Sequence, residues 1–188
     1  MTYYNRYDKK TIESFAIETI SKSYDSKFSK YNSPNSTDNF DFLSEDLTCA
    51  LEVTTAIPDN MFEAYKFEKE QLKGKDNLSI EKIDRAKLDK NGKLISWRGG
   101  TMKETERKIV EAINTKEAKA KKRLQNSKVK IVDLCICLQD GSLFDLKAFK
   151  DTFKNFDNYI FINIFFITPS YFIRYNKDSG FQEFSLKI

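Results

Sequence analysis

The chain is 188 residues long, carries a formal net charge of +4, and contains 16 Phe, 9 Tyr and no His. This length fits one domain with a sizeable core, and the aromatic content argues against disorder over most of it. The absence of histidine excludes Ser-His-Asp and Cys-His catalysis and His-ligated zinc, so any chemistry must use carboxylates, lysines, hydroxyl groups and a hard metal ion.

Residues 8–24 have the spacing of an amphipathic helix, with Asp8 or Thr11 as its N-cap. The side chains on its apolar face are Ile12, Phe15, Ala16, Thr19 and Ile20. Glu13 lies at the edge of this face. It is either a solvated carboxylate of the first turn or part of a site.

Residues 39–55, NFDFLSEDLTCALEVTT, predict a β-hairpin with strands at 40–43 and 47–55. Alternation in the second strand sorts its side chains into two faces. We expect Leu47, Cys49, Leu51 and Val53 on a core face, and a small, polar opposite face made of Thr48, Ala50, Glu52 and Thr54. A carboxylate in mid-strand is costly to desolvate unless something compensates its charge, and a metal ion is one such compensation.

The middle of the chain predicts two helices, at 58–73 and 79–89, followed by a turn at Asn91-Gly92 and a short strand at 93–97. A long helix is expected over residues 101–125. Its sheet-facing stripe is formed by Met102, Ile109, Ile113, Ala120 and Leu124, and Lys116 falls on the same stripe.

The second half of this long helix is strongly basic, with Lys116, Lys119, Lys121, Lys122 and Arg123. Two interpretations are compatible with this cluster. The cations can form a solvated face that complements the negative end of the helix dipole. They can also form a surface that contacts phosphates, since Lys and Arg clusters supply most non-specific affinity for nucleic acids.

The C-terminal third alternates between buried strands and a helix. Residues 129–138 and 159–168 predict strands buried on both faces, and residues 146–156 predict a helix that turns Leu146, Phe149, Phe153 and Phe156 inward. A hairpin with strands at 171–175 and 181–188 ends the chain. Both faces of the sheet need covering, so we expect an α/β protein of a single domain, 1–188, with three α/β/α layers and a central mixed sheet.

The sequence indicates neither a membrane segment nor a secretory signal. Its longest apolar run, at 159–168, has the length of a strand, and the N-terminus is polar. Cys49, Cys135 and Cys137 all lie in apolar strand patterns without a CxxC pair, which favours buried free thiols in a reducing compartment. We therefore expect a cytoplasmic protein that does not contact membranes.

The order of these elements, with Asp41 and then Glu52 on one hairpin, resembles the core of the PD-(D/E)xK nuclease superfamily, the fold of many restriction endonucleases and repair nucleases. The resemblance covers about residues 8–138, with a helical insertion at about 58–90. Residues 139–188 form an extension that ends in the C-terminal hairpin. The resemblance implies a restriction-endonuclease-like core that hydrolyses phosphodiester bonds of nucleic acid with Mg²⁺ (or Mn²⁺).

In this resemblance Asp41 and Glu52 hold the metal ion, with the Val53 carbonyl as a further ligand. Glu13 falls where some members carry a helical carboxylate and is included as a catalytic candidate. The residues that would contact nucleic acid are Lys119, Lys121, Lys122 and Arg123.

Two positions depart from the family pattern. Phe40 rather than Pro precedes Asp41, and Thr54 stands where the Glu-x-Lys motif has its lysine. Some members carry this lysine on the following helix instead. Lys116 is therefore the first candidate for the catalytic lysine and Lys119 the second.

Other interpretations of the same residues stay open. Thr54 favours a nuclease fold that has lost catalysis and that binds nucleic acid or a protein partner. In a purely structural interpretation, Asp41 flanks the turn and Glu52 forms a buried ion pair with Lys116. Many nucleases of this type cut both strands as dimers, so the resemblance also allows a homodimer.

Overall fold

The computed structural model describes residues 8–34, 39–75, 79–138, 147, 149–150 and 159–187. In chain order its elements are α1 (Lys9–Ser23), the 3-10 helix η1 (Ser26–Lys30), β1 (Phe42–Leu43), β2 (Cys49–Thr55), α2 (Asp59–Leu72), β3 (Lys87–Leu88), β4 (Leu94–Ser96), α3 (Met102–Leu124), β5 (Ile131–Cys137), β6 (Asn163–Ile167), β7 (Phe172–Asn176) and β8 (Gly180–Phe184).

Six strands form one mixed sheet in the order β1-β2-β5-β6-β7-β8. The pairs β2–β5 and β5–β6 are parallel, and the pairs at both ends of the sheet are antiparallel. The predicted α/β class with a mixed sheet is therefore confirmed. Three of the six strands follow residue 138, so the C-terminal segment continues the same sheet.

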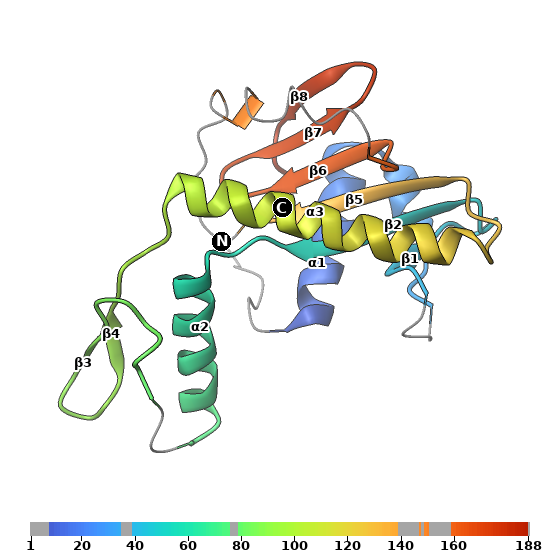
Figure 1. The fold of residues 1–188 in the computed structure, drawn as a ribbon. Coiled ribbons are helices and arrows are strands. Elements are labelled where there is room, and N and C mark those ends of the chain that lie inside the picture. The colour runs from blue at the N-terminus through green and yellow to red at the C-terminus, as the bar shows by residue number, and fades with distance from the viewer. Residues whose placement is uncertain are drawn as a thin grey trace.

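Helices cover the two faces of the sheet, as Figure 1 shows with α3 in front and α1 behind. On the α3 side, Ile109 and Ile113 pack in one cluster with Ala50 and Leu134. On the α1 side, the helix buries its apolar face against the alternate residues of the same strands, Leu51, Val53, Cys135 and Cys137. Strand β2 is thus buried on both of its faces.

This double burial corrects the prediction of a small polar face on β2. Glu52 is 0% exposed and Ala50 is equally buried, because α3 packs over them. Leu47, expected in the core, precedes the strand and is 46% exposed. It has a positive φ of 60°, which is unusual for a residue with a bulky side chain.

Helix α3 begins with a capping box. The Thr101 hydroxyl accepts a hydrogen bond from the Glu104 N–H, and the Glu104 carboxylate accepts one from the Thr101 N–H. Met102 was predicted to face the sheet, but it is 38% exposed, and the buried stripe starts with Thr105 and Ile109. The first turn of α3 extends beyond the sheet, toward α2 (Figure 1).

The insertion contains one of the two predicted helices. Helix α2 forms as expected, whereas residues 79–89 form turns and the strand β3, so that prediction was wrong. The Asp89 side chain accepts hydrogen bonds from the Asn91 and Lys93 N–H groups, and Gly92 supplies a φ of +78°, so a hairpin forms here. The apolar residues that suggested a helix pack against the rest of the insertion instead, since Ile83 is buried against Phe67 and Leu94.

The C-terminal hairpin forms as predicted, with β7 and β8 paired from Phe172↔Phe184 to Asn176↔Gly180. The predicted helix at 146–156 lies outside the described residues except for 147, 149 and 150, which are helical. All three cysteines are free thiols, and Cys135 and Cys137 are buried. Over the described ranges, no helix is both long and apolar enough to cross a bilayer.

Candidate active site

Asp41 occupies a gap at the edge of the sheet. Strand β1 pairs with β2 only at Phe42↔Leu51 and Leu43↔Ala50, and among the described residues no strand pairs with this edge of β2 beyond Leu51. The Asp41 carboxylate fills the gap, since its Oδ2 accepts a 2.8 Å hydrogen bond from the Val53 N–H. A backbone donor that would otherwise lack a partner therefore fixes the orientation of this carboxylate.

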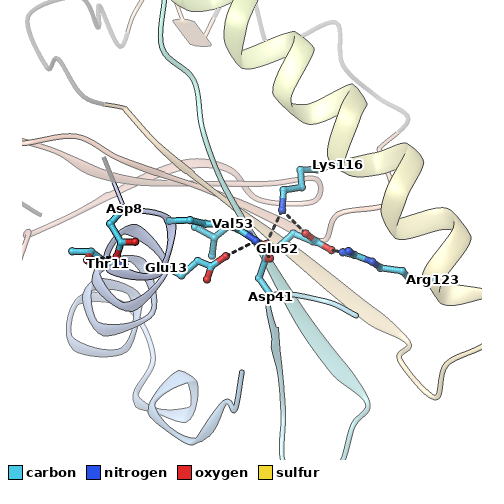
Figure 2. A network of polar contacts seen from close by, with 9 residues as sticks. Asp8, Thr11, Glu13, Asp41, Glu52, Val53, Lys116 and Arg123 are labelled. Carbon is cyan, nitrogen blue, oxygen red and sulfur yellow. Dashed lines mark hydrogen bonds and ion pairs between the residues drawn. The ribbon is translucent and has the colours of Figure 1, made fainter. Parts of the chain in front are cut away.

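Glu52 lies on β2 directly beneath α3, and two cations from that helix reach it (Figure 2). Lys116 Nζ lies 2.5 Å from Glu52 Oε2, and the Arg123 guanidinium contacts Glu52 Oε1. Lys116 and Arg123 are seven residues, or two helical turns, apart and therefore share one face of α3. Both oxygens of a fully buried carboxylate are thus held by positive charges.

Lys116 also joins Glu52 to Asp41. Its ammonium lies 2.6 Å from Asp41 Oδ2, so one cation contacts both carboxylates from the hairpin (Figure 2). The two contacted oxygens can therefore be no more than about 5 Å apart. Asp41 and Glu52 precede Lys116 by 75 and 64 residues, and the fold brings the three side chains together. This convergence is the distinctive feature of the site.

Helix α1 adds a second pair of charges on the outer side of Asp41. Lys9 Nζ lies 3.0 Å from Glu13 Oε1, one helical turn away, and 3.3 Å from Asp41 Oδ1. The N-terminus of α1 is fixed by Asp8, which accepts hydrogen bonds from the Thr11 N–H and hydroxyl (Figure 2). The site therefore combines three carboxylates with three cations.

The carboxylates have different titration behaviour. Burial alone would raise the pKa of Asp41, but the Lys116 charge and the hydrogen bonds from Lys116 and Val53 outweigh it and hold this pKa well below its usual range. Burial and the neighbouring Asp41 charge raise the pKa of Glu52, against the opposing effect of Lys116 and Arg123. Burial likewise raises the pKa of Glu13. Pairs of carboxylates whose pKa values diverge are a pattern of acid–base sites.

The donor set suits a hard divalent cation. Mg²⁺ prefers one or two carboxylates and retains several waters, and Asp41 and Glu52 already converge on one cation, the Lys116 ammonium. The N–H and C=O of one strand residue point to the same side, so the Val53 carbonyl faces the same edge as Asp41. Within the described part of the chain, no group of three or more His, Cys, Asp or Glu is arranged to hold a metal. A metal would therefore rely on these two carboxylates, the backbone and water.

The other predicted basic residues lie in different places. Lys119 is exposed on α3, and Lys121 pairs with Glu117 at 3.2 Å on the same helix. Arg123, predicted to contact nucleic acid, turns inward to Glu52 instead, with its guanidinium carbon 5.7 Å from the centre of the Phe40 ring. Lys122 lines a groove beside the site.

This groove has a volume of about 560 Å³, within the range typical of ligand sites. It lies between the β1–β2 turn and the C-terminal end of α3. Its lining residues are Asn39, Leu43, Leu47, Lys122, Arg123, Asn126, Ser127, Lys128 and Val129. Three of these nine side chains are cations and none is acidic.

Two features of the structure escaped the sequence analysis. Lys9 lies at the site, and its position four residues before Glu13 on one helix was the available signal. Asp133 is a second buried carboxylate, on β5, and a charge within the apolar run VKIVDLCICL was the same signal that had identified Glu52.

No protein family, curated protein or solved structure that we compared with this chain matches it.

Proposed function

We propose that this protein is a metal-dependent phosphodiesterase that cleaves nucleic acid at the site formed by Asp41, Glu52 and Lys116. The observation that carries the proposal is the position of the Lys116 ammonium, 2.6 Å from Asp41 and 2.5 Å from Glu52. Two hard carboxylate ligands and one cation at a single point are the groups that such hydrolysis needs when histidine is absent.

Asp41 and Glu52 would hold Mg²⁺ or Mn²⁺, which supplies a more nucleophilic water and stabilises charge on the phosphate when it is bound. Asp41 suits this role because its lowered pKa keeps it ionised and the Val53 N–H fixes its orientation. Lys116 contacts the same oxygens that would hold a metal, so its ammonium would have to leave at least one carboxylate when the metal binds. Its role would then be to stabilise the negative charge that develops on the phosphate.

Cleavage of a supercoiled plasmid and of labelled single-stranded DNA and RNA, in Mg²⁺ or Mn²⁺ and in EDTA, tests this proposal. We expect metal-dependent cleavage that falls by at least about 100-fold in Glu52→Gln and in Lys116→Met, since each removes a group that acts in the transition state. Lys103→Met is the matched control, because Lys103 is exposed near the other end of α3.

Cleavage by well-purified Glu52→Gln protein at the wild-type rate, with the fold intact by circular dichroism, would remove this site from consideration.

A second candidate function is nucleic-acid binding without catalysis. Two observations favour it. Both Glu52 oxygens are already paired with cations, Lys116 and Arg123, and Thr54 stands where the PD-(D/E)xK motif has its lysine. This alternative predicts binding of an oligonucleotide that weakens steeply with salt, and no cleavage with Mg²⁺, Mn²⁺ or Ca²⁺.

A further inference from the structure

The Arg123 side chain contributes to both the buried ion pair and the basic groove. Its guanidinium contacts Glu52 Oε1 in the interior, and its side chain also lines the basic groove at the end of α3. The side chain is 19% exposed, whereas Glu52 is 0% exposed. Arg123 is therefore the residue through which the contents of the groove can act on Glu52.

The chemistry of the groove fits a nucleic-acid strand. Lys122 and Lys128 are exposed cations on its wall, and amide and hydroxyl groups of Asn39, Asn126 and Ser127 also line it. Leu47 adds an exposed apolar side chain at the rim. Surfaces that bind single strands usually combine two kinds of group. Cations contact the phosphates, and neutral or apolar groups contact the sugars and bases.

A guanidinium binds phosphate and carboxylate with the same planar donor geometry. A phosphate in the groove therefore competes with Glu52 for Arg123. The helix dipole gives no equivalent reason for Arg123 to turn inward, because the cations that complement it can remain on the surface, as Lys122 does.

We propose that Arg123 couples the groove to the metal site: a backbone phosphate of single-stranded nucleic acid takes Arg123 from Glu52 and thereby makes a Glu52 oxygen available. This coupling rests on the proposed function in one respect, that a metal then binds the released carboxylate. By linkage, a strand in the groove and a metal on Glu52 strengthen each other's binding.

A double-mutant cycle on strand binding tests the competition directly. Binding of a fluorescent 12-nucleotide single-stranded DNA is measured by anisotropy in EDTA, so that neither metal nor cleavage contributes. Glu52→Gln keeps the shape of the side chain but removes the charge that holds Arg123, so we expect about five-fold tighter binding. In the Arg123→Ala background, the same substitution should change Kd by less than about 1.5-fold.

Asp133→Asn is the matched control. It removes a buried carboxylate from the opposite face of the sheet, where its hydrogen bonds are with Asn163. We expect a change in Kd below about 1.5-fold, since this residue does not compete for the guanidinium. Lys122→Ala and Lys128→Ala should each weaken binding and reduce its salt dependence.

Equal tightening by Glu52→Gln with and without Arg123, or no tightening at all, would overturn the coupling. A strand that binds none of these proteins would overturn the groove assignment. Neither result depends on cleavage, so the failure of the proposed hydrolysis remains distinguishable. Should Glu52→Gln fail to fold, the ¹⁵Nε resonance of Arg123 in the wild-type protein replaces it. That resonance is expected to shift when the strand is added, and an unchanged resonance at saturation counts against the coupling.

Discussion

Glu52 and Asp133 are two buried carboxylates on adjacent strands, and their surroundings differ in kind. Asp133 pairs in register with Leu51, next to Glu52, but it points to the opposite face of the sheet. Glu52 is held by two cations from α3. Asp133 accepts hydrogen bonds from the N–H and side-chain amide of Asn163, at 3.0 Å and 2.8 Å, and the Asn163 side chain is in turn bound by Asn176.

The difference separates the carboxylate that we propose as a metal ligand from one that is structural. Burial in mid-strand is common to both residues and therefore does not distinguish them. Glu52 is compensated by cations on long side chains, which we propose exchange for a metal or a substrate, whereas Asp133 belongs to a hydrogen-bonded network of neutral amides. Burial raises the pKa of Asp133 to about 6, against the lowering by Asn163 and by the through-space charges of Lys27 and Arg174.

Substituting Lys116, the cation shared by Asp41 and Glu52, should have the largest effect on the free energy of unfolding. Lys116→Met leaves Asp41 and Glu52 facing each other without their common partner. We expect a loss of about 3–5 kcal/mol in the free energy of unfolding, the usual consequence of breaking a buried ion pair. Urea denaturation measures it, with Lys119→Met, at an exposed position on the same helix, as the control. A loss below about 1 kcal/mol would mean that the pair is not buried in solution.

The pH dependence of the free energy of unfolding tests the description of Asp133. Its pKa rises from an ordinary 3.8 to about 6 in the folded protein, so the folded state binds the proton more tightly than the unfolded state. The contribution of Asp133 to stability should therefore fall as pH rises from about 4 to about 6 and stay reduced above that range. Asp133→Asn keeps the acceptor for Asn163 and removes the charge, so between pH 4 and pH 7 it should gain about 2–3 kcal/mol relative to wild type.

Thermal or urea unfolding at both pH values measures this difference. Asp178→Asn, at an exposed acid in the β7–β8 turn, provides the control. A relative stability that does not change with pH would show that Asp133 titrates normally.

The smallest effect is expected at Asp41. In Asp41→Asn, Lys116 keeps its contact with Glu52, and the amide oxygen can still accept from the Val53 N–H. The free energy of unfolding at pH 7 should fall by about 1–2 kcal/mol, because the charge contacts with Lys116 and Lys9 are lost while the acceptor for Val53 is kept. Glu45→Gln, at an exposed position in the adjoining turn, is the reference for urea denaturation. A loss as large as that of Lys116→Met would identify Asp41 as the main structural anchor.

The sequence predicted those parts of the fold that depend on periodicity. The positions along the chain of the strands of the main sheet, both hairpins that belong to it, and helices α1, α2 and α3 follow from spacing alone, as does the position of Lys116 on the inward stripe. Residues 79–89 were misassigned because Ile80, Ile83 and Leu88 have helical spacing, whereas the Asp89 side chain and Gly92 fix a hairpin.

The site was harder to predict because its contacts depend on where long side chains extend, which the spacing of residues along the sequence does not determine. Arg123 was grouped with surface cations because sequence alone does not tell which long side chain at the end of a helix turns back. Glu52 was placed on a polar face because the depth of α3 over β2 is a tertiary property. Asp133 was passed over although a charge between Val132 and Leu134 is the signal that had identified Glu52.

The two-residue length of β1 has a consequence for association with other chains. An uncovered sheet edge offers free backbone groups to any extended segment, which invites aggregation. At Val53 the Asp41 carboxylate already holds the N–H, and Lys9 and Glu13 from α1 lie beside it. A foreign strand would have to displace a charged, hydrogen-bonded group. The residue proposed to bind the metal therefore also protects the molecule from edge-to-edge pairing, and substitutions there should be examined for self-association as well as for activity.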